Sequence, residues 1–177
     1  MNDDREVWDR ICGGDTSAFE ALYREHGVRL AAFLKQMTGD KQAAEDVMQE
    51  TFAQIWKRPN GFQPERGTLR SYLFGAARKR AAEWWRKNGR ENGPASSEKD
   101  HSVCGAETES LVGDAFEQLP QEQRTLLWLR EVEGQSYAEL AAILEIPVGT
   151  VRSRLFAARE ELRRVWNSKA KLKEERT

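Results

Sequence analysis

Four side chains near the C-terminal end of the sequence have types and spacings suited to nucleic-acid binding. Arg152, Ser153, Phe156 and Arg159 recur at spacings of one, three and four, so they share one face if their segment is helical. Arginine pairs bidentately with guanine or phosphate, a serine hydroxyl bonds to either, and a phenylalanine ring contacts the methyl group of thymine. The pattern predicts DNA binding. The alternative is a helical hairpin with a solvated charged face.

The elements around these residues predict a helix-turn-helix. A capping box at Ser136–Glu139 opens a short helix through Leu144, residues 145–147 form a turn, and a longer basic helix runs from about Val148 into the 160s. This arrangement places the second helix in the major groove of DNA. Arg154 lies on another side of that helix, where we expect it to contact phosphate or to support the fold.

A second candidate surface is the helix predicted for residues 68–87. Phe74, Arg78 and Trp85 are spaced four and seven apart with Lys79 beside them, so aromatic and cationic side chains share one face. Rings stack on unpaired bases while cations follow the phosphates, which indicates binding of single-stranded DNA. For Trp85 the alternative, burial in the core at a domain edge, stays open.

The loop before this helix, residues 59–67, adds two candidates. Its proline and glycine residues predict turns, Phe62 is expected to be exposed, and Arg66 supplies a further cation. The preceding helix has an apolar stripe within residues 44–56. Its other side carries carboxylates and amides, which an ordinary solvated face would also carry. The members of this polar face are Glu45, Asp46, Gln49 and Glu50.

All predicted elements are helices, so the fold class is all-α. A capping box at Ser17–Glu20 opens the first helix, which Gly39-Asp40 ends, and a later helix spans residues 121–132. Residues 88–110 lose this periodicity and are rich in small, polar and acidic residues, which predicts a flexible acidic linker. The charged residues 167–177 are expected to fray. The sequence therefore predicts two small helical domains, residues 1–87 and residues 111–177, joined by the linker 88–110, with the helix-turn-helix in the second.

Charge is distributed unevenly along a chain whose net charge is −1. Residues 61–90 hold 8 basic and 2 acidic side chains, residues 91–123 hold 1 and 8, and residues 124–177 hold 11 and 8. Two basic blocks on either side of an acidic one suggest two surfaces that face polyanions. Solvated helix faces with charges arranged by chance are the alternative.

Several classes of protein are disfavoured by what the sequence lacks. Its apolar runs are far shorter than the ~20 residues that cross a bilayer, and its acidic first ten residues are unlike a secretory signal. Cys12 and Cys104 form no disulfide framework, so we expect a cytoplasmic protein. His101 and Cys104 offer two ligands where a structural zinc needs four, and His26 is isolated. No metal, cofactor or catalytic role is therefore expected.

Two ordered blocks of the sequence resemble the extracytoplasmic-function (ECF) sigma factors of the sigma-70 family. Residues 136–141 (SYAELA) and 147–155 (PVGTVRSRL), entered through residues 119–124 (LPQEQR), are similar to the C-terminal domain of that family. Residues 44–52 (AEDVMQETF) are similar to the helix of its N-terminal domain that docks on polymerase. The resemblance spans about residues 17–87 and 111–165.

The resemblance implies a transcription initiation factor that binds core RNA polymerase, through its β′ clamp and β flap, and promoter DNA. The polar face that includes Asp46 would contact the clamp. The predicted helix-turn-helix would bind the −35 element through Arg152, Ser153, Phe156 and Arg159, with Arg154 on phosphate. The −10 strand would be held by Phe62, Arg66, Phe74, Arg78, Lys79 and Trp85. The resemblance also implies an anti-sigma partner.

The sequence departs from the family pattern at two places. Ala157 occupies a position where some members carry a basic residue, and the loop 59–67 differs from the "FRGE"-like form of many members. Both departures bear on promoter preference. The rival hypothesis is an ordinary helix-turn-helix regulator with a dimerisation domain, which would bind a symmetric operator without polymerase.

Overall fold

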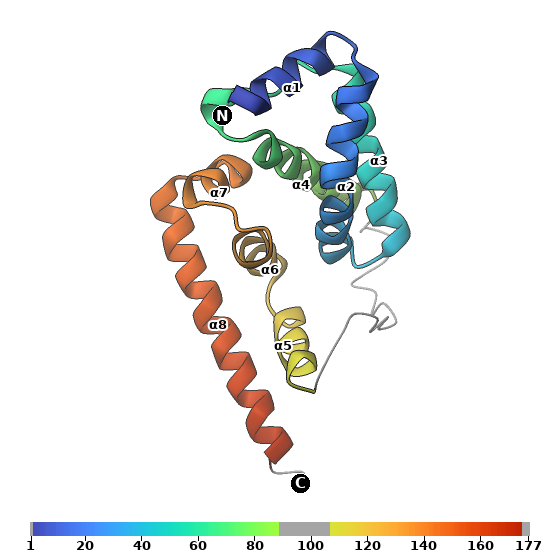
Figure 1. The fold of residues 1–177 in the computed structure, drawn as a ribbon. Helices are drawn as coiled ribbons and strands as arrows, with labels where there is room; N and C mark the ends of the chain where they lie inside the picture. The colour runs from blue at the N-terminus through green and yellow to red at the C-terminus, as the bar shows by residue number, and fades with distance from the viewer. Residues whose placement is uncertain (1, 89–106, 175–177) are drawn as a thin grey trace. The chain divides into compact units, whose positions relative to one another are not determined.

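The computed structural model describes residues 2–88 and 107–174, and every regular element within these ranges is helical. This confirms the all-α prediction. The chain divides into two compact units (Figure 1), the first made of Met1–Ser97 and Ala138–Ile146, the second of Glu98–Tyr137 and Pro147–Thr177. The predicted linker lies largely outside the described residues, and the domain boundaries drawn from the sequence stay a prediction.

The first unit begins with a helix that the sequence pattern did not predict. In α1 (Asn2–Cys12), Trp8 and Ile11 are buried, with 5% and 1% of their surface exposed. Asp4 of the same helix ties it to a later one, because its Oδ2 accepts a hydrogen bond from the backbone N–H of Leu69 at 2.9 Å. Two buried apolar side chains among acidic neighbours make no repeated stripe, so periodicity could not reveal α1.

α2 (Thr16–Thr38) is capped two residues before the expected cap. Asp15 is its N-cap, and Asp15 Oδ1 accepts hydrogen bonds from the backbone N–H groups of Ser17 and Ala18 at 2.9 and 3.2 Å. The prediction of a capping box that starts at Ser17 is therefore wrong. An aspartate caps a helix as well as a serine does, and the earlier residue satisfies the first free backbone donors.

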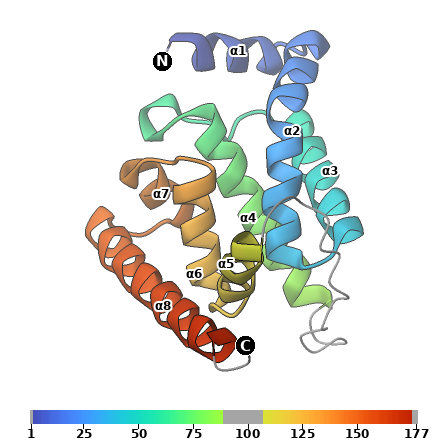
Figure 2. The same cartoon turned by 60° about the horizontal axis from the view of Figure 1, so that its bottom comes forward.

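The break between α2 and α3 (Lys41–Lys57) is confirmed where the sequence placed it. Gly39 ends α2 with a φ of 74°, in the left-handed region, and its N–H donates to Lys35 O at 2.8 Å. Asp40 then caps α3, accepting a hydrogen bond from the N–H of Ala43 at 2.7 Å. This short connection sets α2 and α3 side by side (Figures 1 and 2).

A third long helix, α4 (Leu69–Asn88), packs against both α2 and α3 and follows the short 3-10 helix η1 (Pro64–Arg66). Thr68 caps α4 as predicted, because its Oγ1 accepts a hydrogen bond from the N–H of Ser71 at 3.1 Å. The rings of Phe33 and Phe74 meet at 5.2 Å in the centre of the unit. Each fully buried side chain of this kind stabilises the fold by about 1.5–3 kcal/mol. The large side chains with no exposed surface here are Leu30, Phe33, Leu34, Leu73 and Phe74.

The second unit is built around α8 (Val148–Glu174), along which α5 (Glu107–Glu117) and α6 (Gln121–Leu127) pack (Figure 2). A π-helical segment, η2 (Trp128–Val132), continues α6, where the sequence predicted one α-helix to residue 132. α7 (Tyr137–Leu144) begins directly after Ser136, as the second capping box predicts. Its residues from Ala138 onward belong to the first unit.

Two further element ends differ from the sequence prediction. α5 begins at Glu107, ahead of the expected return of helix at residue 111. α8 runs to Glu174, so the prediction of a frayed tail from residue 167 is wrong for most of that tail. An ion pair between Lys169 Nζ and Asp114 Oδ2 at 3.7 Å fastens the late part of α8 to α5. No helix in the described ranges is long and apolar enough to cross a membrane.

Candidate DNA- and polymerase-binding surfaces

The predicted DNA-reading face of α8 is open to solvent. Arg152, Ser153, Phe156 and Arg159 are all exposed, and the Phe156 ring has 68% of its surface accessible. Arg154 is exposed as well. Buried side chains on the other side of the helix hold it in place, so this face is fixed by packing. They are Val151, Leu155 and Ala158.

An aromatic ring organises the cations of this surface. The guanidinium of Arg130 lies 5.0 Å from the centre of the Tyr137 ring, and that of Arg152 lies 5.9 Å from it. Arg130 is held further by a hydrogen bond of 2.7 Å from its Nη1 to Gln135 O. Cation–π contacts of this kind restrain arginines that would otherwise sample many rotamers. Both Arg130 and Tyr137 were missed from the sequence, since no helical spacing relates them to Arg152.

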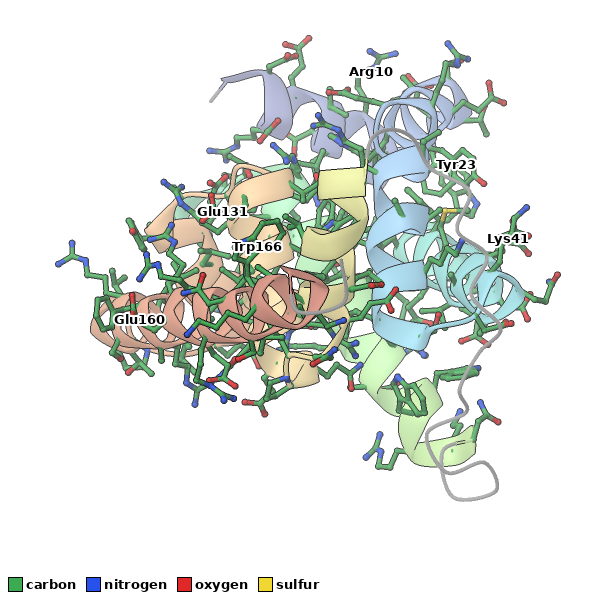
Figure 3. The ribbon with its side chains drawn as sticks, turned by 90° about the horizontal axis from the view of Figure 1, so that it is seen from below. Arg10, Tyr23, Lys41, Glu131, Glu160 and Trp166 are labelled. Atoms are coloured by element: carbon green, nitrogen blue, oxygen red, sulfur yellow. The ribbon has the colours of Figure 1, made fainter. Side chains whose placement is uncertain are left out.

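Glu131 joins the same surface through Arg159. Arg159 Nη2 and Nε donate to Glu131 Oε1 at 2.6 and 3.2 Å. The hydrogen bond to Glu131 raises the pKa of Arg159 above its ordinary value. Figure 3 labels Glu131, which η2 carries. The two residues are 28 positions apart in the sequence, so only the fold brings them together.

The loop before α4 differs from expectation at its aromatic residue. Phe62 is buried with 7% exposed, and its ring packs 5.4 Å from Trp8 and 5.8 Å from Tyr72. The prediction that Phe62 is exposed is wrong because α1, which was not foreseen, covers it. Gly61 lets the loop approach this cluster, since a Cβ at Gly61 would collide with the Tyr72 hydroxyl group.

The predicted aromatic and cationic face of α4 is only partly realised. Phe74 is fully buried against Phe33, so its placement on a solvent-facing surface is wrong. Trp85 is half-buried, and its Nε1 donates to Met37 O at 2.9 Å. Helical spacing alone could not separate these residues from the core, because α4 is contacted by α2 and α3 on more than one side.

The cations of α4 lie nearer to solvent and contact the α7 residues of the same unit. Arg78 is half-buried, and its Nε donates to Ile143 O at 3.1 Å. Lys79 is exposed and pairs with Glu145 at 2.6 Å, an interaction that lowers the pKa of Glu145. Arg66 in η1 is exposed.

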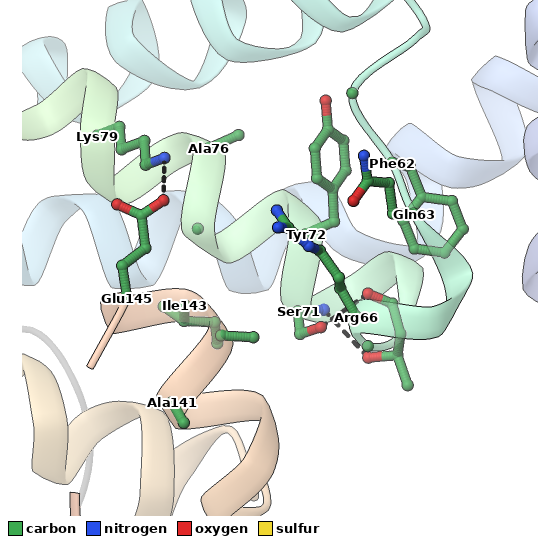
Figure 4. A pocket seen from close by; sticks show the side chains of 15 residues that line it. Phe62, Gln63, Arg66, Ser71, Tyr72, Ala76, Lys79, Ala141, Ile143 and Glu145 are labelled. Carbon is green, nitrogen blue, oxygen red and sulfur yellow. Dashed lines mark hydrogen bonds and ion pairs between the residues drawn. The ribbon is translucent and has the colours of Figure 1, made fainter. Parts of the chain in front are cut away.

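A pocket of about 700 Å³ opens between the loop, α4 and α7 within the first unit (Figure 4). Tyr72 presents its aromatic ring there, and Arg66 and Lys79 supply positive charge. Sites for small planar ligands have volumes of about 300–1,000 Å³ and combine apolar walls with a few polar groups. The pocket therefore has the size of a small-molecule site, and its lining combines an aromatic ring and two cations with the carboxylate of Glu145, which pairs with Lys79.

The polar face of α3 is arranged as predicted. Asp46, Gln49 and Glu50 are exposed and Glu45 is half-exposed, whereas the opposite side of the helix is buried. Asp46 Oδ1 accepts a hydrogen bond of 3.0 Å from Gln42 Nε2. The face thus offers carboxylates and amides to an incoming protein.

Two aromatic side chains border this face, although their helical spacing had indicated that they belong to the core. Tyr23 and Trp56 have 41% and 36% of their surface exposed. The Trp56 ring lies 4.9 Å from Phe19, and Tyr23 lies 4.7 Å from Phe52. Tyr23 projects into solvent from the α2–α3 pair (Figure 3). Partly exposed aromatic rings beside polar groups are typical of protein interfaces.

Neither histidine nor cysteine forms a metal centre in the described part of the chain, where no group of three or more potential ligands comes together. His101 and Cys104 lie outside the described residues. Cys12 is exposed, and its Sγ donates a hydrogen bond to Pro59 O at 2.8 Å. His26 is buried, and desolvation lowers its pKa.

Comparison with known proteins assigns both halves of the chain to one family. Residues 22–91 match the family model of Sigma-70 region 2, and residues 110–162 match that of Sigma-70, region 4. The chain is 31% identical to the RNA polymerase sigma-H factor of Pseudomonas aeruginosa, over 90% of this chain and 91% of the relative. It is 30% identical to the ECF RNA polymerase sigma-E factor of Escherichia coli K12, over 90% and 92%.

Solved structures agree with these matches. The structure of CnrH in complex with the cytosolic domain of CnrY is similar with a TM-score of 0.71 and 25% identity, covering 93% of this chain and 97% of that one. The sigma factor RpoE of Bartonella quintana, in complex with the anti-sigma factor NepR, is similar with a TM-score of 0.68 and 26% identity, covering 84% and 96%.

An all-helical chain with these two regions in this order is a sigma factor, and the chain belongs to the sigma-70 family. Within that family it is of the ECF type, and it directs promoter-specific initiation of transcription by RNA polymerase. Sigma factors are non-enzymatic regulators of transcription.

Proposed function

We propose that the exposed face of α8 reads the −35 element of the promoter. The observation that carries this assignment is the Phe156 ring, 68% exposed between the cations Arg152 and Arg159 on a helix whose other side is buried. In a major groove the ring would meet a thymine methyl group, while Arg152 and Ser153 bond to base edges or phosphates. Arg154 is assigned to a phosphate.

The −10 strand is assigned to the pocket beside η1 and α4. Arg66 and Lys79, which line the pocket, would follow the phosphates, and the half-buried Arg78 and Trp85 of α4 would contact the strand outside the pocket. Arg78 and Lys79 must exchange their contacts with α7 for contacts with DNA. Extrusion of a base costs a few kcal/mol, which the pocket has to offset by stacking and hydrogen bonds. Phe62 and Phe74 are buried, so their role is indirect: their packing holds the loop and α4 in the conformation that forms the site.

Core RNA polymerase is assigned to α3, with the β′ clamp as the partner of Glu45, Asp46, Gln49 and Glu50 and the β flap as a second attachment. An acidic and amide rim suits an interface with arginine-rich partners, where charge sets orientation and association rate. The exposed rings of Tyr23 and Trp56 would add apolar area at its edge.

The remaining assignments concern partners and location. One of the similar structures is of CnrH in complex with the cytosolic domain of CnrY, and the other is of a sigma factor in complex with an anti-sigma factor. We propose such a partner for this chain, one that covers its polymerase-binding surface. The chain would act in the cytoplasm with RNA polymerase, catalyse no reaction itself and require no cofactor.

The test uses holoenzyme reconstituted with core polymerase. Arg152→Ala should reduce transcription from a −35-dependent promoter while binding to core stays unchanged. Arg164→Ala is the matched control, because Arg164 is an exposed arginine of the same helix, paired with Glu161 and five residues beyond Arg159, the last of the proposed contacts. Equal loss of transcription in both variants would refute the assignment of the Arg152 face.

Asp46→Arg tests the polymerase assignment separately. Reversing the charge should weaken binding to core, and unchanged binding would remove α3 from the interface. A gel shift on promoter duplex with and without core separates this function from that of an ordinary helix-turn-helix regulator. The regulator would shift the duplex alone and would require a symmetric site.

A further inference from the structure

The DNA-facing surface of the second unit contains a carboxylate within its cluster of cations. Three arginines, Arg130, Arg152 and Arg159, gather around Tyr137, and Glu131 lies among them. Among the described contacts of this cluster, Glu131 is the acidic partner of Arg159. A negative charge here works against the attraction of phosphates that the arginines provide.

The geometry of the pair shows which hydrogen-bond donors of Arg159 are occupied by Glu131. An arginine presents five N–H donors in a fixed fork, and the edge formed by Nε and one Nη pairs with a carboxylate or a phosphate. Arg159 directs both atoms of this edge to Glu131 Oε1, at 3.2 and 2.6 Å. Glu131 therefore occupies one of the two edges through which Arg159 could pair bidentately with a DNA phosphate or a guanine.

The pair is open to solvent, which makes the exchange possible. The side chains of Arg159 and Glu131 are 43% and 53% exposed, and surface ion pairs of this kind are weak and screened by salt. A phosphate that arrives with the rest of a duplex can displace the carboxylate. Contact with a single phosphate, without support from neighbouring contacts, competes less well.

We propose that Glu131 is a specificity-determining residue that competes with DNA for Arg159 and so lowers sequence-independent binding by α8. This rests on the proposed role of α8 at the −35 element. Contacts of Arg152, Ser153 and Phe156 to the correct bases would compensate for the competition, whereas a random duplex offers only phosphates. Discrimination between promoter and other DNA rises as a result.

The test measures binding of holoenzyme, reconstituted from the full chain and core polymerase, to a fluorescein-labelled duplex of random sequence, by anisotropy across a range of salt concentrations. Glu131→Gln keeps the size of the side chain and removes its charge. We expect it to bind about two- to five-fold more tightly, the range that a surface ion pair corresponds to. The slope of log affinity against log salt should steepen by about one, for one additional phosphate contact.

Glu161→Gln is the matched control, because Glu161 pairs with Arg164 on α8 through the same two arginine nitrogens and lies on the other side of the helix. Its affinity and slope should equal those of the wild type. In an Arg159→Ala background, Glu131→Gln should give no gain. A gain that persists without Arg159, or no gain in the single variant, would overturn the proposal.

A further variant separates this proposal from the proposed function. If Arg152→Ala binds the duplex more weakly while Glu131→Gln equals the wild type, α8 binds DNA and only the role of Glu131 is refuted. If Arg152→Ala and the wild type bind equally, the α8 face does not bind DNA, and both proposals are refuted.

Discussion

Gln135 is the side chain that most directly tests the packing of the second unit. It is buried with 1% of its surface exposed, and neither its Oε1 nor its Nε2 has a hydrogen-bond partner among the described residues. Both of its backbone polar groups are hydrogen-bonded, because its N–H donates to Leu129 O at 2.9 Å and its carbonyl accepts from Arg130. A change of side chain alone therefore leaves the backbone contacts in place. We predict that Gln135→Leu stabilises the unit.

The magnitude follows from the buried amide. A buried polar group without a partner costs about 1–3 kcal/mol, which the leucine removes. The difference in shape between the two side chains costs up to about 1.5 kcal/mol. At the middle of these two ranges the free energy of unfolding should therefore rise by about 1 kcal/mol. For a unit of this size the melting temperature would rise by about 4–8 °C per kcal/mol.

Hydrogen exchange read by mass spectrometry at increasing urea concentrations measures this unit separately from the other. Peptides from α6 and α8 should keep their protection to higher urea in Gln135→Leu. Gln118→Leu is the control, since Gln118 is exposed in the same unit and should change stability by less than about 0.5 kcal/mol. Earlier loss of protection in Gln135→Leu would show that the amide is bonded, and the reasoning would be refuted.

Three further perturbations test the first unit. Trp8→Ala should lower its free energy of unfolding by about 3–5 kcal/mol in urea titrations, because the ring packs on Phe62 and Tyr72, and an unchanged midpoint would contradict that packing. Asp40→Ala should lower the free energy of unfolding by about 1 kcal/mol in the same assay, because α3 loses its cap. Asp40→Asn should lower it much less, since asparagine also caps helices. Equal losses in the two variants would argue against capping. Burial lowers the pKa of His26 from its ordinary 6.5, so the unfolded chain binds more protons and stability falls as pH decreases below about 6.5. His26→Gln should reduce the difference between the urea midpoints measured at about pH 7.5 and about pH 5.5. An unchanged difference would exclude His26 as the source of the pH dependence.

The sequence predicted the elements whose signals are local. The break at Gly39-Asp40 and the cap at Thr68 depend on side chains that bond to backbone groups a few positions away. The exposed face of α8 follows from helical spacing, which needs only one helix. For the same reason the acidic face of α3 was predicted correctly around Asp46.

The misses arise where distant segments meet. Phe62 has the surroundings of an exposed loop residue, and only the packing of Trp8 from an unforeseen helix buries it. Phe74 shares a helical face with cations, but α2 contributes Phe33 to cover it. The pairing of Glu131 with Arg159 follows from the way η2 and α8 come together, which no spacing within one helix encodes.

The length of α8 has a consequence for how promoter DNA can be shaped. At about 1.5 Å per residue, its 27 residues form a stiff rod about 40 Å long. A helix curves only gently while its backbone hydrogen bonds stay intact, so a rod of this kind cannot follow a groove around the duplex. Any adjustment on docking therefore falls on the duplex, or on the turn just before the rod, where Glu145 has a φ of 57°. Sequences that bend easily next to the −35 element would then be favoured at positions the protein never touches.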